Sequence, residues 1–154
     1  MTSNVKPVMR TAQETADHVR HGMWANDQAC QALGMQVLAV TPGSATLSMP
    51  VRADMLNGHA ICHGGLIATL ADSAFAYACN SYDELTVASS FAIELLAPGK
   101  LGDVLTAHCT EQAKGGRTGL YDVQVYNQRG ERVAVFRGRS YTLKGRLAVP
   151  ANPA

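Results

Sequence analysis

The order of segments along this amino-acid sequence predicts an α+β fold, in which a curved antiparallel β-sheet wraps around a long central helix. Two short segments in which apolar and polar residues alternate precede a nearly uncharged apolar segment, and four longer segments predicted as strands follow it. A helix that is apolar nearly all round must be covered on most sides. One strongly curved sheet is the economical cover, and 154 residues are enough for one such domain.

The N-terminal part predicts helix. Residues 9–31 are rich in Ala, Gln, Glu, His and Met and lack proline, which indicates one or two helices that stop near Gly34. We therefore expect an N-terminal helical segment over residues 1–30. A single domain over residues 31–145 and a disordered, proline-containing tail over residues 146–154 should follow it.

Within the domain, the segments around the turn Thr41-Pro42-Gly43-Ser44 alternate with a period of two and predict a hairpin. Residues 50–63 read as a loop and residues 64–82 as the central helix. Short, turn-rich separators divide the rest into four predicted strands, which we expect to pair as an antiparallel meander. These strands cover residues 85–96, 103–113, 118–128 and 132–143.

Composition narrows the classes of function. Only 16% of residues are charged, which favours an oligomer that buries part of its surface, and a net charge of +1 argues against nucleic acid as a partner. No apolar run approaches the roughly 20 residues that span a bilayer, and the polar first 20 residues do not resemble a signal peptide. We expect a cytoplasmic protein without a membrane partner. Its four widely spaced cysteines should be reduced thiols rather than a metal site.

The central helix carries the candidate chemistry. It begins at His63-Gly64-Gly65, and Asp72 is the only charged residue between Gly64 and Asn80. The first amide N–H groups of a helix lack internal partners, and a glycine lets a substrate carbonyl approach them. The Gly65 N–H is therefore a candidate for polarising a carbonyl group, although a glycine pair can also serve only a tight turn.

Asp72 lies seven residues after Gly65, on nearly the same helix face and about 10 Å along the axis. An ionised carboxylate in apolar surroundings is costly unless it is paired or hydrated, which suggests a use for it. The alternative is a solvent-facing polar stripe that Asp72 shares with Thr69, Ser73 and Asn80.

Residues from about 30 to 143 resemble the PaaI-type acyl-CoA thioesterases, which have the hotdog fold. The resemblance rests on Asn57, His63-Gly64-Gly65, Leu70-Ala71-Asp72-Ser73-Ala74-Phe75-Ala76-Tyr77-Ala78-Cys79-Asn80, Ala88-Ser89-Ser90 and Leu96-Ala97-Pro98-Gly99. It implies hydrolysis of an aryl-acetyl or short to medium acyl-CoA, with phenylacetyl-CoA or a ring-hydroxylated relative favoured. It also implies a homotetramer built from two dimers. No cofactor or metal is expected, because coenzyme A is part of the substrate.

The resemblance further implies an active site shared between subunits, where Gly65 of one chain faces Asp72 of the other. Asp72 would act as nucleophile or as general base. Asn57 would position water or the thioester, unless it only holds a turn. His63 would hydrogen-bond the loop or the substrate carbonyl, and Ser73 would orient water beside Asp72. The neighbouring Gly58-His59-Ala60 departs from the bulkier apolar residues of the family.

Coenzyme A needs cations for its phosphates and polar groups along its pantetheine arm. The cationic candidates are Lys114, Arg117, Arg137 and Arg139, with Ser89 and Ser90 near the pantetheine. Gly138, between the last two arginines, would leave room for close approach of the ligand to the backbone. An ordinary solvated strand face explains each arginine about equally well.

Two other functions fit parts of the pattern. A hotdog hydratase would need an Asp–His pair or a His-Phe-Pro sequence on the loop before the helix, and neither is present. A non-catalytic acyl-CoA-binding module would keep the coenzyme A surface but would not need a carboxylate in the apolar helix. Asp72 therefore favours the enzyme.

Overall fold

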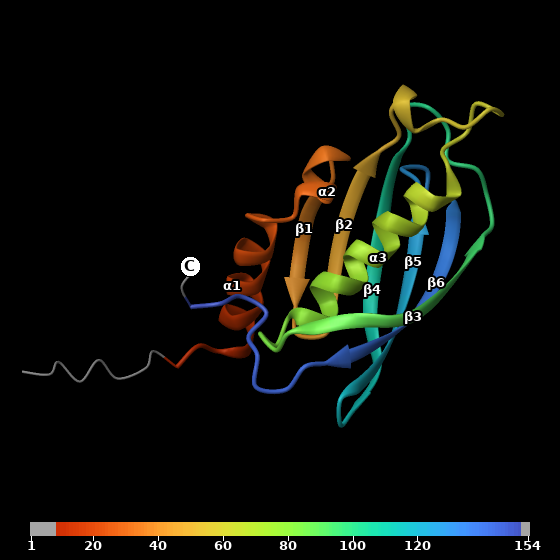
Figure 1. The fold of residues 1–154 in the computed structure, drawn as a ribbon. Helices are drawn as coiled ribbons and strands as arrows, with labels where there is room; N and C mark the ends of the chain where they lie inside the picture. Colours follow the sequence, from red (N-terminus) through yellow and green to blue (C-terminus); the bar gives the residue numbers. More distant parts are fainter. Residues whose placement is uncertain (1–8, 152–154) are drawn as a thin grey trace, which may run out of the picture.

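The computed structural model describes residues 9–151, which form one six-stranded sheet curved around a long helix. Figure 1 shows helix α3 lying in the concave side of this sheet. The elements are α1 (Ala12–Trp24), α2 (Gln28–Ala32), β1 (Gln36–Thr41), β2 (Ser44–Pro50), the short 3-10 helix η1 (Ala53–Met55), α3 (Gly64–Asn80), β3 (Thr86–Leu95), β4 (Val104–Gly115), β5 (Thr118–Tyr126) and β6 (Arg132–Thr142). The predicted α+β fold is confirmed.

The sheet differs from the prediction in the place of one strand. Its order is β1-β2-β4-β5-β6-β3, with every neighbouring pair antiparallel. Strands β4, β5 and β6 form the expected meander, but the expected pairing of β3 with β4 is wrong. Strand β2 already occupies the free edge of β4, so β3 pairs with β6 at the far side of the sheet.

The core lies between α3 and the concave face of the sheet. The Phe75 ring of α3 packs against Tyr121 and Phe136, with ring centroids 5.4 Å and 5.9 Å apart. A Cβ atom at Gly138 would lie only 2.8 Å from the Phe75 ring. Gly138 therefore makes room for α3, and the expectation that it makes room for a ligand is wrong.

The described part of the N-terminal segment forms two helices, as predicted, but α2 ends at Ala32, just past the predicted range, and residues 1–8 lie outside the described chain. A capping box between Thr11 and Glu14 starts α1, and Gly34 adopts the left-handed conformation just after α2, with φ of +69°. The α2 region is fastened to α3 by two side-chain contacts. Tyr77 donates to Asp27 at 3.1 Å and the Cys30 thiol donates to Ser73 at 3.2 Å.

Part of the segment expected to be a disordered tail is held against the domain. The backbone N–H of Val149 donates to the Asp83 carboxylate at 3.0 Å, and that of Leu85 donates to the Arg146 carbonyl at 2.9 Å. The Val149 side chain also covers Gly22 of α1. Disorder is thus wrong for residues 146–149, because these contacts hold them against the domain, and residues 152–154 lie outside the described chain. None of the helices within residues 9–151 is long and apolar enough to cross a membrane.

Candidate active site

The start of α3 leaves two backbone donors without protein partners. The first α3 amides to be hydrogen-bonded are those of Leu66 and Ile67, which both donate to the His63 carbonyl. Within residues 9–151, the N–H groups of Gly64 and Gly65 have no acceptor. The positive end of the helix dipole adds to their attraction for an electron-rich oxygen.

Gly64 and Gly65 differ in the space around them. A Cβ atom at Gly64 would lie 2.5 Å from the Leu95 side chain, whereas one at Gly65 would meet nothing within 4 Å. Gly64 is needed because β3 packs close to the helix. Gly65 faces open space, so an external group can reach its N–H.

Asn57 lies in the loop before this turn, and its side chain holds that loop, which is one of the two roles expected from the sequence. Its side-chain oxygen accepts from the backbone N–H groups of His59 at 2.9 Å and Ile61 at 3.3 Å. The amide nitrogen of Asn57 has no acceptor in the described part of the chain, so its two N–H donors are available. The His63 ring is exposed, and its side chain makes no capping hydrogen bond.

An apolar pocket of about 420 Å³ adjoins the start of α3. Its lining residues are Asn57, Ile61, Cys62, Gly64, Ile67 and the run from Leu95 to Pro98. This volume lies within the range of small-molecule sites. Size alone does not identify the site, because a larger hollow of about 640 Å³ lies elsewhere, between α1 and the tail at Val149.

Asp72 lies two turns further along α3 and outside the lining of that pocket. Its carboxylate is half-buried and makes no hydrogen bond or ion pair within residues 9–151, and burial raises its pKa above the ordinary value of 3.8. A raised pKa makes a carboxylate a stronger base. Small residues surround it on the least covered face of α3, namely Gly65, Ala68, Thr69 and Ala76.

The other polar residues of α3 do not join Asp72 in a solvent-facing stripe. Ser73 is buried, donates to the Thr69 carbonyl at 2.6 Å and accepts from Cys30, so its hydroxyl is already engaged. Asn80 is buried and bonds both backbone groups of Thr86 at 2.9 Å, which ties the helix end to β3. The polar-stripe interpretation is wrong, and nothing in this geometry brings the Ser73 hydroxyl to water beside Asp72.

Two of the four cationic candidates have protein partners. Arg137 makes a two-bond ion pair with Asp122 at 2.6 Å and 2.9 Å, which lowers the pKa of that carboxyl. Lys114 lies 3.7 Å above the Tyr82 ring and 3.8 Å from Glu84. For both residues these contacts favour an ordinary solvated strand face over binding of the coenzyme A phosphates.

Arg117 and Arg139 are exposed and have no carboxylate partner within residues 9–151. Arg139 borders a hollow of about 190 Å³ formed by the ends of β4 and β5, near the turn that carries Arg117. Opposite it on β3, Ser89 donates to the Arg139 carbonyl at 3.1 Å and Ser90 pairs with Arg139 in the sheet.

Sequence analysis gave no role to two features that shape this region. Leu95 lines the 420 Å³ pocket and Asp103 accepts from the Lys100 N–H in the adjoining turn, but a leucine in a strand and an aspartate before one look ordinary. The turn Pro98-Gly99-Lys100-Leu101-Gly102-Asp103 separates two predicted strands, and its first two residues also belong to the Leu96-Ala97-Pro98-Gly99 motif of the family resemblance. No cluster of three or more potential metal ligands occurs among residues 9–151.

A curved antiparallel sheet wrapped around one long helix is the hotdog fold. The family model described as Thioesterase superfamily matches residues 59–134. The chain belongs to the PaaI-type thioesterases of this superfamily and is a thioester hydrolase.

Relatives and solved structures support this membership. The chain is 46% identical over 127 residues to the acyl-coenzyme A thioesterase PaaI of Escherichia coli strain K12, an alignment that covers 82% of this chain and 91% of the relative. The solved structure of the E. coli PaaI protein superposes with a TM-score of 0.86 at 43% identity, covering 88% of this chain and 99% of that one. A Streptococcus mutans protein bound to acetyl CoA superposes with a TM-score of 0.70 at 28% identity, covering 73% and 90%.

Proposed function

We propose that this protein hydrolyses acyl-CoA thioesters, using Asp72 and the Gly65 N–H as its catalytic groups. The observation that carries the proposal is the shared open face of α3, where an accessible N–H donor and an unpaired carboxylate lie two turns apart. The E. coli relative, named an acyl-coenzyme A thioesterase, and the acetyl CoA bound to the S. mutans structure support this substrate class.

In this mechanism the Gly65 N–H donates to the thioester carbonyl oxygen as negative charge develops on it. Losing one such donor costs about 100- to 1000-fold in kcat in the enzyme class where it is best measured. In one route Asp72 attacks the carbonyl carbon, the C–S bond breaks to release the coenzyme A thiolate, and water then hydrolyses the resulting anhydride to the free acid and the Asp72 carboxylate. In the other route Asp72 removes a proton from water, which attacks the carbonyl carbon and displaces the thiolate, and the proton passes to that thiolate. The free amide donors of Asn57 then orient the water or the ester, and the His63 ring contacts the substrate carbonyl.

One chain cannot supply both groups to one thioester, because Gly65 and Asp72 are about 10 Å apart along the helix axis. Two antiparallel copies of α3 related by a two-fold axis near residues 68 and 69 would bring Gly65 of one chain beside Asp72 of the other. The small side chains of Ala68 and Ala76 on that face allow close approach of the helices. We therefore infer a site shared across a dimer.

Strand β3 supports the same dimer. It is an edge strand, and its apolar residues Val87, Phe91 and Leu95 are each about half exposed. Edges and apolar patches of this kind are normally covered in proteins, and a second copy would cover both. Two such dimers would form the homotetramer that the low charge content favours.

The substrate would occupy the 420 Å³ pocket at the start of α3 and the 190 Å³ hollow beside Arg139. The apolar 420 Å³ pocket fits an aryl-acetyl or a short to medium acyl group, with phenylacetyl or its ring-hydroxylated form favoured. Arg139 and Arg117 are the better candidates for the coenzyme A phosphates, because Arg137 and Lys114 already have partners. Ser89 and Ser90 would lie near the pantetheine arm.

The test is the Asp72→Asn variant assayed with phenylacetyl-CoA and straight-chain acyl-CoAs by loss of thioester absorbance, which avoids signal from the four protein thiols. Asparagine keeps the size and removes the charge, so we expect a fall in kcat of about 100-fold or more. The matched control is Asp17→Asn, which changes an exposed aspartate on α1 and should keep full activity.

A folded Asp72→Asn variant that retains activity would refute the role of Asp72. A wild-type protein that binds acyl-CoA without hydrolysing it would favour the binding module.

A further inference from the structure

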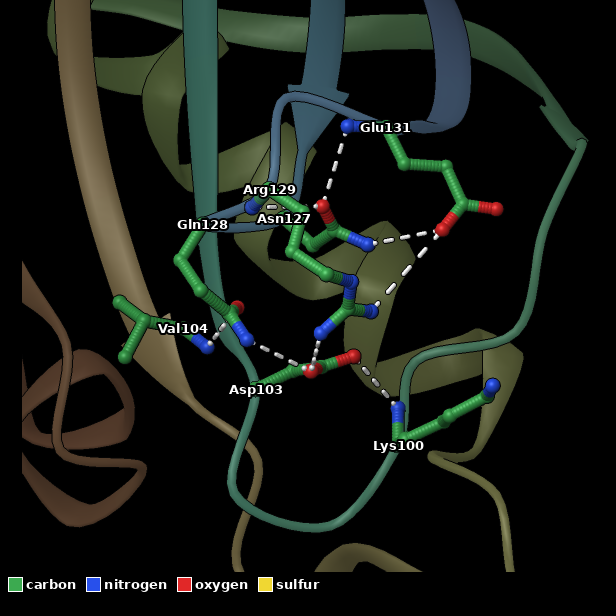
Figure 2. A network of polar contacts seen from close by, with 7 residues as sticks. All are labelled: Lys100, Asp103, Val104, Asn127, Gln128, Arg129 and Glu131. Carbon is green, nitrogen blue, oxygen red and sulfur yellow. Dashed lines mark hydrogen bonds and ion pairs between the residues drawn. The ribbon is translucent and has the colours of Figure 1, made fainter.

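Asp103, the residue directly before β4, is a buried carboxylate at the centre of a polar network, shown in Figure 2. Its side chain is only 4% exposed. One oxygen accepts from Gln128 at 2.9 Å and from the Arg129 guanidinium at 3.0 Å, and the other accepts from the Lys100 backbone N–H at 2.9 Å. Three donors from two loops thus converge on one carboxylate.

The hairpin between β5 and β6 holds these donors in place. The side-chain oxygen of Asn127 accepts from the backbone N–H groups of Arg129 and Glu131, each at 3.0 Å, and its amide donates to Glu131 at 3.1 Å (Figure 2). Gln128 also accepts from the Val104 N–H at 2.9 Å. The hairpin is therefore a preformed support for the segment that ends at Asp103.

Residues 96–98 of that segment line the 420 Å³ pocket and form its wall together with Leu95. The Gly99 carbonyl accepts from the Cys62 N–H at 2.8 Å, directly before the turn that starts α3. A Cβ atom on Gly99 would lie 3.1 Å from Cys62, so the two backbones are packed closely. The wall is thereby held by the Asp103 network on one side and the helix start on the other, and the Val133 carbonyl of β6 accepts from the N–H groups of Leu96 at 2.8 Å and Ala97 at 3.2 Å.

We propose that Asp103, Gln128 and Arg129 are positioning residues that set the acyl-group selectivity of this enzyme by fixing the pocket wall from Leu95 to Pro98. The inference rests on the proposed function, in which this pocket receives the acyl group. An apolar pocket discriminates between acyl groups by the fit of its walls, and a single methylene changes the rate constant by about 10- to 200-fold. A wall freed on one side loses that fit for a large acyl group but not for an acetyl group, which is too small to depend on the wall.

The experiment compares kcat/KM for phenylacetyl-CoA and acetyl-CoA in the wild type and in Arg129→Met. Methionine keeps an apolar stem and removes the guanidinium, while Gln128 and the Lys100 N–H still bond Asp103. We expect the ratio between the two substrates to fall about tenfold, mainly through KM for phenylacetyl-CoA. Arg129→Lys, which keeps a cation, should restore most of the ratio. Arg132→Met is the matched control, because Arg132 is exposed and makes no ion pair within residues 9–151.

The outcomes separate this inference from the proposed function. An unchanged ratio in folded Arg129→Met would overturn the inference, and so would an equal loss with both substrates, which indicates a general structural effect. If Arg129→Met does not fold, Arg129→Gln serves for the same comparison. A wild type that hydrolyses neither ester would overturn the proposed function and this inference with it, whereas Asp72→Asn does not bear on selectivity.

Discussion

Replacing Asp103 by asparagine should remove one of the main electrostatic contributions to the stability of this fold. The substitution preserves the size of the side chain but removes its charge. It also turns one acceptor oxygen into an N–H donor, which then faces a donor from Lys100, Gln128 or Arg129. A buried site built for a carboxylate therefore loses a charge-assisted hydrogen bond and gains an unpaired donor.

The pKa of Asp103 gives the magnitude. Burial alone would raise this pKa, but hydrogen bonds from Gln128, the Lys100 N–H and Arg129 outweigh burial and lower it from the ordinary value of 3.8 to about 2. That depression corresponds to about 2 kcal/mol of stabilisation of the folded state when the group is ionised. Hydrogen bonds to charged groups are worth a similar amount, about 1.5–3 kcal/mol.

The pH dependence follows from the sign of the shift. The folded-state pKa is below the unfolded value, so the stabilisation is complete above about pH 4 and is lost as the pH falls toward 2. The wild type should therefore exceed Asp103→Asn by about 2 kcal/mol at pH 7, and this difference should shrink between pH 4 and pH 2.

Urea unfolding measures this difference in the free energy of unfolding. The protomer concentration is kept the same for both proteins, because the stability of an oligomer rises with concentration. Asp54→Asn is the matched control. Asp54 pairs with Arg52 at 3.0 Å, but its side chain is 69% exposed, so its loss should change stability by less than about 0.5 kcal/mol. A difference below about 0.5 kcal/mol for Asp103→Asn at pH 7, or one that stays constant down to pH 2.5, would refute the reasoning.

Two further predictions concern the proposed catalytic groups. Gly65→Pro removes the N–H at a position in the first helical turn where proline is tolerated, so this variant and Asp72→Asn should each be inactive. Co-refolded mixtures of the two should regain activity, because one of the two sites in a mixed dimer then has both groups; no recovery would contradict a shared site. The acid limb of kcat/KM against pH should have its midpoint above 3.8, because burial raises the pKa of Asp72 and the protonated carboxyl is inactive. A limb at or below 3.8 would contradict an essential buried carboxylate.

The fold could be predicted largely from local pattern. Alternation in the strands and the uncharged apolar run around Asp72 fixed the type and order of the elements, because both depend on which faces of a segment are buried. Strand order was not predictable in the same way. The separator between β3 and β4 is short and looks like a hairpin turn, yet β4 pairs with β2, and β3 pairs with β6.

The candidate site divides along the same line. The sequence singled out Gly65 and Asp72 as candidates because a glycine pair at a helix start and a lone carboxylate in an apolar helix are both costly and unusual. The surroundings of Ser73 and Arg137 were not visible, because their partners Cys30 and Asp122 come from other elements. The same holds for Gly138, whose free space is filled by Phe75.

The sequence by itself determined the class of fold, the position of the central helix, and the two groups on its open face to which we assign the chemistry. Periodicity and unusual local residues reflect burial and backbone conformation, which act over a few neighbouring positions. Tertiary structure alone decided the place of β3, the pairing of Arg137 with Asp122 and the donors that converge on Asp103. These depend on contacts between segments distant in the chain, and no local pattern records which distant donor meets which acceptor.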